Sequence, residues 1–135
     1  MTVADVLDLV QSTLDSILSE SGVRSYWGRR ADDGQANPSE YVIYDVDRDE
    51  AEVSADGDLY YRTISVSLQY YVKYSGARTY TGRRTTNDRM ETMREAMRSA
   101  GFGCPSGWYE IGDVDDIGFA TFRADFELPH EVGEE

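Results

Sequence analysis

The run from Leu59 to Tyr74, LYYRTISVSLQYYVKY, places the strongest constraint on how this chain folds. It contains neither Gly nor Pro and is rich in Tyr, Val, Ile and Thr, a composition typical of a β-strand. From Ile64 onward apolar residues alternate with polar or amphipathic ones, so one face should be buried and the other should meet water or a partner. At about 3.3 Å per residue such a strand reaches roughly 50 Å, far beyond the usual five or six residues. We therefore expect a strand that extends past its own domain and serves assembly.

The length of 135 residues predicts one domain with a sizeable core. We assign residues 1–128 to this domain and residues 129–135 to a polar C-terminal tail. No apolar run approaches the roughly 20 residues of a membrane span, and no secretory signal is expected. The single cysteine, Cys104, excludes an internal disulfide.

Residues 3–20 are expected to form the first helix, because apolar residues recur at steps of three and four along one stripe. Thr2 and Asp5 resemble a capping box at its start, and Gly22 stands where the helix should stop. We prefer a purely structural role, in which the apolar face of this helix packs on a sheet.

Residues 87–100 are expected to form the second helix, with Thr85 or Thr86 as its cap and Gly101 at its end. Three of the four methionines of the chain share one face of this helix, which favours an adaptable core face over a specialised binding box.

Further strands are expected on both sides of the long run. Turn residues without periodicity predict a loop over residues 31–40. Apolar and alternating patterns predict strands at residues 23–29, 41–46, 108–111 and 119–128, with residues 112–118 as a hairpin loop.

An acidic segment, residues 45–58, precedes the long run and holds seven carboxylates. The spacing of Asp45, Asp47 and Asp49 imitates the start of a calcium-binding EF-hand loop. The sixth position of that loop, which needs Gly, is Glu50, so a solvated acidic hairpin is the better interpretation and a calcium-binding module the alternative.

A cationic segment, residues 75–86, follows the long run. Its glycines and Arg83 do not match the spacing and the lysine of a phosphate-binding P-loop. We interpret it as a mobile loop that either is simply solvated or docks on the carboxylates of a neighbour, since Arg favours interface ion pairs. The residues expected to make such contacts, in this loop and on the polar side of the long strand, are Arg78, Tyr80, Arg83, Arg84, Tyr61, Tyr71 and Lys73.

The residues that catalysis needs are scarce. His130 is the only histidine and lies in the expected tail, and Cys104 has no candidate imidazole partner. Zinc ligands are lacking as well, so we expect neither an enzyme, nor a metal site, nor a cofactor. The net charge of −13, from 26 acidic and 13 basic residues, speaks against nucleic acid as the main partner.

The order of these elements resembles the tail terminator, or tail completion, proteins of long-tailed phages and tailed archaeal viruses. The segments that carry the resemblance are the MTVADVLDLV helix, Pro38 with Tyr41–Tyr44, Arg62–Tyr74, the Met90–Phe102 helix with its terminal Gly-Phe, and the hairpin marked by Tyr109, Gly118 and Phe126. The resemblance covers nearly the whole chain as a pattern of order and length, without a diagnostic motif.

The resemblance implies an α/β (α+β) fold, an antiparallel β-sheet with a long central hairpin strand flanked by two α-helices. It also implies a structural virion protein, made in the host cytoplasm, that forms a homo-oligomeric ring of six copies. Such a ring caps the tail tube, stops its polymerisation and joins it to the head-side connector, and DNA passes through its lumen without sequence-specific binding. Acidic copies repel one another at low ionic strength, so net charge alone predicts that assembly strengthens with salt.

Besides the calcium-binding module, two alternatives to the tail terminator remain open. One is another neck or head-closure connector of the same virion. The other is a stand-alone ligand-binding α/β domain, which would be monomeric and have an apolar pocket among its tyrosines.

Overall fold

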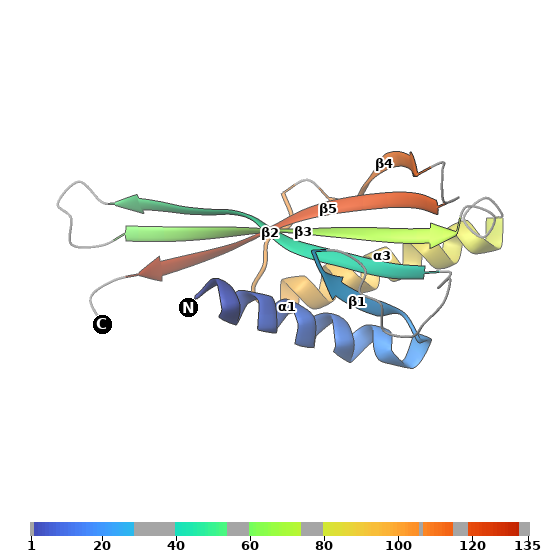
Figure 1. Cartoon of the computed structure of the whole chain (residues 1–135), viewed down its shortest axis with the longest axis horizontal. Coiled ribbons are helices and arrows are strands. Elements are labelled where there is room, and N and C mark those ends of the chain that lie inside the picture. Colours follow the sequence, from blue (N-terminus) through green and yellow to red (C-terminus); the bar gives the residue numbers. More distant parts are fainter. Residues whose placement is uncertain are drawn as a thin grey trace.

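The structure, a computed structural model, describes residues 2–28, 40–53, 60–73, 80–105, 107–114 and 119–132. One sheet and two α-helices make up this part of the chain, so the predicted α+β class is confirmed (Figure 1). The elements in chain order are α1 (Val3–Leu18), the short 3-10 helix η1 (Ser19–Ser21), β1 (Arg24–Trp27), β2 (Glu40–Val53), β3 (Tyr60–Lys73), α3 (Tyr80–Ser99), β4 (Tyr109–Val114) and β5 (Phe119–Val132).

The sheet has five strands in the order β1-β2-β3-β5-β4. All neighbouring pairs are antiparallel except β1 and β2, which run parallel with Arg24 opposite Tyr41. The sheet is therefore mixed, where an antiparallel one was expected. The long strand β3 lies at its centre, between β2 and β5.

Helix α1 begins with the predicted capping box. The backbone N–H of Asp5 donates to Thr2 Oγ1 at 3.1 Å, and the backbone N–H of Thr2 donates to Asp5 Oδ2 at 2.8 Å. The hydrogen bonds from the backbone and hydroxyl of Thr2 also lower the pKa of Asp5. After η1 the chain turns at Gly22, whose φ of 72° lies in the left-handed region that glycine adopts without strain.

Helix α3 begins at Tyr80, seven residues before the predicted start, so residues 80–86 are helical and not part of a loop. Thr85 and Thr86 do not cap the helix, because their hydroxyls donate to the carbonyls of Thr81 and Gly82 inside it, at 3.0 and 2.8 Å. Thr86 is buried one turn ahead of the methionine face and so extends that face toward the N-terminus. Arg78 and the rest of residues 74–79 lie outside the described residues.

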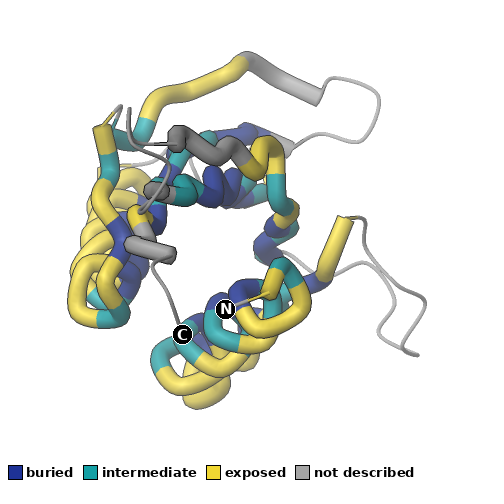
Figure 2. Tube along the Cα trace, turned by 90° about the vertical axis from the view of Figure 1, so that its left-hand side faces the viewer, coloured by how far each residue is buried: buried dark blue, intermediate teal, exposed yellow. Residues whose placement is uncertain are grey.

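Both helices pack on the same face of the sheet, as Figure 1 shows. There the apolar side chains of β3, which point to one side of the strand, contact the apolar faces of α1 and α3. Figure 2 shows the buried parts of the helices and the sheet facing a shared interior. The largest fully buried side chains of this core are Tyr70, Phe122, Phe126, Leu14, Leu18, Ile64, Leu68, Met93 and Met97. The opposite face of the sheet carries no described helix.

The three central strands are each 14 residues long and continue past the helices. We call the overhanging part the arm: residues 50–53 of β2, 60–63 of β3 and 129–132 of β5, paired with one another. In Figure 1 the arm reaches beyond the N-terminus of α1.

The arm changes two predicted boundaries. A strand ending at residue 46 was predicted, but β2 continues to Val53, so the acidic residues 45–53 form the first strand of an antiparallel hairpin with β3. Residues 129–132 belong to β5 and not to a tail. Pairing with β3 explains both extensions, because the long central strand offers hydrogen-bonding partners on either side. The expected loop at 31–39 and turn at 55–57 lie outside the described residues. Neither described helix is long and apolar enough to cross a membrane.

Candidate interaction surface

The helix-free side of the sheet is the most polar surface that the strands build. Cross-strand partners share a face, so the register identifies its members. On the three central strands they are Tyr41, Ile43, Asp45 and Arg48 of β2, Ser65, Ser67, Gln69 and Tyr71 of β3, and Thr121, Arg123, Asp125 and Glu127 of β5. We call this set the open face.

A β-bulge between Val46 and Arg48 shapes the middle of the open face. The extra residue, Asp47, accepts a hydrogen bond from Ser67 Oγ at 3.2 Å and forms an ion pair with Arg123 at 2.7 Å. Bulges bend a strand locally and re-aim side chains, which is how β2 brings this carboxylate over β3.

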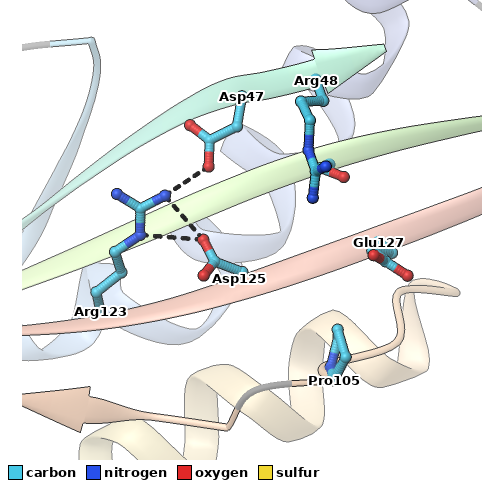
Figure 3. A pocket seen from close by; sticks show the side chains of 7 residues that line it. Asp47, Arg48, Pro105, Arg123, Asp125 and Glu127 are labelled. Atoms are coloured by element: carbon cyan, nitrogen blue, oxygen red, sulfur yellow. Dashed lines mark hydrogen bonds and ion pairs between the residues drawn. The ribbon is translucent and has the colours of Figure 1, made fainter. Parts of the chain in front are cut away.

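Arg123 joins the outer strands across β3. Besides Asp47 on β2, it contacts Asp125 Oδ1 at 3.0 Å (Figure 3). Tyr109 of β4 donates its hydroxyl to the other oxygen of Asp125 at 3.3 Å. Partial burial lowers the pKa of the Arg123 guanidinium, but the carboxylates of Asp125 and Asp47 outweigh it and the net shift is upward. The group therefore acts as a permanent cation that ties β5 to β2 across β3.

An open hollow of about 520 Å³ lies beside this network. Pro105, from the connection between α3 and β4, forms its rim, because Gly103 in that connection bridges to Glu127 on β5. The lining residues, shown in Figure 3, are Asp47, Arg48, Ser65, Pro105, Arg123, Asp125 and Glu127. With three carboxylates and two guanidinium groups, the hollow suits charged groups of a partner and not an apolar ligand.

One end of the open face is aromatic. Tyr71 stacks on Tyr41 with ring centroids 4.7 Å apart, and Tyr26 meets Tyr41 edge-on at 6.3 Å. Tyr26 and Tyr41 are buried and Tyr71 is half-buried, and burial raises the pKa of the Tyr71 phenol. Tyr71, predicted as a contact residue, is thus largely engaged within its own chain.

The other predicted contact residues separate into two groups. Lys73 ends β3 and Tyr80, 83% exposed, begins α3, so both lie at the same end of the molecule as Arg83 and Arg84 (Figure 1). Tyr61 sits in the arm at the opposite end, ten residues and roughly 33 Å along β3 from Tyr71.

Within the first group, Arg83 and Arg84 differ. The Arg83 guanidinium carbon lies 5.0 Å from the centre of the Phe122 ring, a cation–π contact within the chain. Arg84 is exposed and makes no ion pair within the described part of the chain.

A second polar cluster, which sequence analysis missed, lies on the helix side of the sheet. Tyr70 donates its hydroxyl to Glu40, whose Oε2 also lies 2.5 Å from Arg89 Nε, an ion pair without a well-aligned hydrogen bond. Burial, and then the hydrogen bond to Glu40, raises the pKa of Tyr70 well above its usual range. The alternation pattern assigned Tyr70 to the core, but no pattern predicts which carboxylate its hydroxyl meets.

The three aspartates of the candidate calcium segment do not converge. Asp45 accepts from Trp27 Nε1 at 3.1 Å, Asp47 belongs to the Arg123 network, and Asp49 is held by Arg62 at 2.6 Å. The hydrogen bond from Arg62 lowers the pKa of Asp49. Within the described ranges, no three His, Cys, Asp or Glu side chains are grouped to hold a metal ion.

Cys104 is half-buried, and burial raises the pKa of its thiol, which reduces its reactivity as a nucleophile.

Comparison with known proteins identifies no family. No protein-family model matches the chain, and no curated protein matches it. The open face and the arm are therefore the features on which a functional conclusion rests.

Proposed function

We propose that this chain is a ring-forming structural protein of a tailed virion, a tail terminator that caps the tail tube, stops its polymerisation and joins it to the head-side connector. The observation that carries the proposal is the arm, in which three paired strands continue past the helices that cover the rest of the sheet. Such an overhang adds nothing to the chain's own helix-packed core, but it gives a neighbouring subunit a large surface to contact.

The order and lengths of the elements support the same role. A helix, a sheet with an overlong central hairpin and a second helix were expected from the resemblance to tail terminators, and the described residues contain them in that order. A closed ring of identical copies needs a heterologous contact between two different surfaces, which an elongated subunit with distinct ends provides.

The net charge suits a ring through which DNA passes. With 26 acidic against 13 basic residues, a lumen lined by this chain repels phosphates and lets DNA slide without sequence-specific binding. A lumen lined by arginine would contradict this part of the proposal. The role proposed is steric, without catalysis, cofactor or metal.

A neck or head-closure connector is the nearest alternative, since it also forms rings around DNA. The stand-alone ligand-binding domain is less well supported. The tyrosines Tyr26, Tyr41 and Tyr71 pack against one another, Tyr41 on Tyr71 stacked and Tyr26 on Tyr41 edge-on, and the hollow on the open face is lined mostly by charged groups.

The decisive experiment adds the purified chain to polymerising tail-tube protein of the same virus and follows tube length by electron microscopy. We expect rings at tube ends and tubes that stop growing, whereas a control chain lacking residues 129–135 should cap poorly because the arm loses one strand. A chain that stays monomeric and leaves tube growth unchanged would overturn the proposal. Binding to the head-side connector with unlimited tube growth would favour the neck protein instead.

A further inference from the structure

One stretch of the sequence, residues 59–87, is cationic in an otherwise acidic chain. Between Asp58 and Asp88 the sequence contains no acidic residue. Lys73 and Arg84 are exposed there and make no ion pair in the part of the chain that the structure describes. We call this the cationic end and define it as Lys73, Tyr80, Arg83 and Arg84.

The cations of this end do not serve the helix on which they lie. The N-terminal turn of α3 has no acidic residue, and Arg83 and Arg84 follow directly after it. The N-terminus of a helix carries a partial positive charge, so cations close to it are neutral or slightly unfavourable. Arg83 contacts the Phe122 ring of its own chain, but the position of Arg84 is better explained by a partner. The 83% exposed ring of Tyr80 nearby supplies contact area for one.

The open face has the opposite charge, and the arm continues it. Across the three central strands the register places Arg48, Ser65 and Glu127 in one row, Glu50, Thr63 and Pro129 in the next, and Glu52, Tyr61 and Glu131 in the last. The open face carries four carboxylates, on Asp45, Asp47, Asp125 and Glu127, against two arginines, Arg48 and Arg123. The arm rows add acidic residues at three register positions, 50, 52 and 131. Both arginines line the hollow beside these carboxylates, and Arg123 is ion-paired to two of them.

The acidic surface forms a shallow groove along its central strand, β3. Ser65 and Ser67 on the central strand are small and buried, while the flanking strands carry the longer charged side chains. Three strands spaced about 4.8 Å apart over some twelve residues give on the order of 600 Å², close to the roughly 800 Å² that each partner contributes to a standard interface. The surface is thus large enough for a protein contact.

The two charged regions belong to different ends of one molecule. The cationic end lies where β3 stops and α3 starts, and the acidic rows lie toward the arm at the other end of the same strand (Figure 1). One copy cannot bring its own two regions together without unfolding. We propose that copies of this chain associate head to tail, with the cationic end of one copy docked on the acidic open face and arm of the next.

This inference deepens the proposed function, on which it rests, by naming the two surfaces that meet in the ring. It also reverses an earlier expectation. Net charge alone predicts that salt strengthens assembly, whereas contacts between opposite charges weaken as salt screens them. Whether salt strengthens or weakens assembly therefore distinguishes repulsion between acidic copies from attraction between these two surfaces.

The test measures the mass of the purified full chain by sedimentation and light scattering at about 0.05 M and about 0.5 M NaCl. We expect oligomers at low salt that dissociate at high salt. Arg84→Glu and Glu127→Lys should each weaken association at least about tenfold, and the double variant should recover most of it because the pair is restored with reversed charges.

Matched controls separate local contacts from overall charge. Arg98→Glu changes the net charge as Arg84→Glu does, at the other end of α3, where Arg98 pairs with Glu95 at 2.9 Å. Glu91→Lys, exposed in the middle of α3, matches Glu127→Lys. Both controls should shift association less than about twofold, and the urea midpoints of all four single variants should match that of the wild type, as surface changes do.

Several results would overturn the inference. One is a wild-type chain that is monomeric at low salt, and another is an equal effect of Arg84→Glu and Arg98→Glu. A third is loss of duplex DNA binding in Arg84→Glu with unchanged assembly, which would assign the cationic end to nucleic acid. If the chain forms rings that cap tubes and these substitutions have no effect, the proposed function is supported and the docking surfaces are wrong. If ring formation depends on these charges but the rings do not cap tubes, the docking surfaces are supported and the proposed function is wrong.

Discussion

At the scale of single residues, the open face depends on one side chain. Arg123 reaches Asp47 and Asp125 at 2.7 and 3.0 Å and so holds together two carboxylates that would otherwise repel each other. These groups are about a third exposed, so the surrounding water weakens the interaction, but the bridge links strands on both sides of β3.

Replacing this guanidinium should therefore cost a modest amount of stability. We expect Arg123→Met, which keeps an apolar stem, to lower the free energy of unfolding by about 1 kcal/mol in urea titrations. Arg98→Met, which removes an exposed pair with Glu95 within one helix, should cost less than about 0.5 kcal/mol. An equal decrease in the free energy of unfolding for the two variants would show that the Arg123 network stabilises the fold no more than an exposed ion pair does.

Tyr70 leads to a prediction at alkaline pH. Its burial and its bond to Glu40 raise its pKa above the usual value of 10, so the folded protein favours the protonated phenol. The stability that this provides is complete below about pH 10 and is lost as the pH rises toward the pKa of the folded state. Phenolate absorbance of the wild type and of Tyr70→Phe should coincide until alkaline unfolding and then differ by one tyrosine. A difference that appears before unfolding would contradict the burial of this hydroxyl.

At the scale of elements, the arm makes the end of β5 part of the fold. Pro129–Val132 pairs with Tyr60–Thr63, so these residues are more than a polar tail. A chain ending at Leu128 removes that pairing, whereas a chain ending at Val132 keeps it.

We expect the shorter truncation to speed amide hydrogen exchange in Tyr60–Thr63, because one edge of β3 loses its partner, while exchange in Ile64–Val72 stays slow. The chain ending at Val132 should behave like the full chain. Unchanged protection of Tyr60–Thr63 in the shorter chain would show that the arm does not depend on β5.

Helix α3 was only partly predicted from local sequence patterns. The methionine spacing predicted its C-terminal half correctly, but Gly82 and the run of arginines and threonines favoured a loop over residues 80–86. Propensity is a weak prior that tertiary packing overrides, and here the burial of Thr86 against the core continues the helix by more than a turn. The same extension moves Arg83 and Arg84 from a loop onto a rigid element.

At the scale of the whole molecule, the net charge of −13 opposes the folding of each copy even where local charges favour association. We expect salt to raise the melting temperature of Arg84→Glu, in which assembly is weakened, because screening reduces self-repulsion in the compact state. Scanning calorimetry of dilute protein between about 0.01 M and about 0.5 M NaCl measures this. A melting temperature that falls with salt would show that ion pairs within the chain outweigh its net charge.

The sequence by itself determined the elements whose signals are local. Alternation defined β3 and its buried side, and a three-and-four periodicity and a capping box defined α1. The fold class came from the resemblance that the order of the elements carries. Such patterns depend on neighbours a few residues apart, which the sequence displays directly.

Only the tertiary structure decided which residues share a surface. The pairing of Asp47 with Arg123 spans 76 residues, both helices lie on one face, and β2 and β5 gain their arm segments only because β3 offers them partners. The separation of a cationic end from an acidic face arises in the same way. Register and packing between distant segments create these features, and no local pattern records which strand will lie beside which.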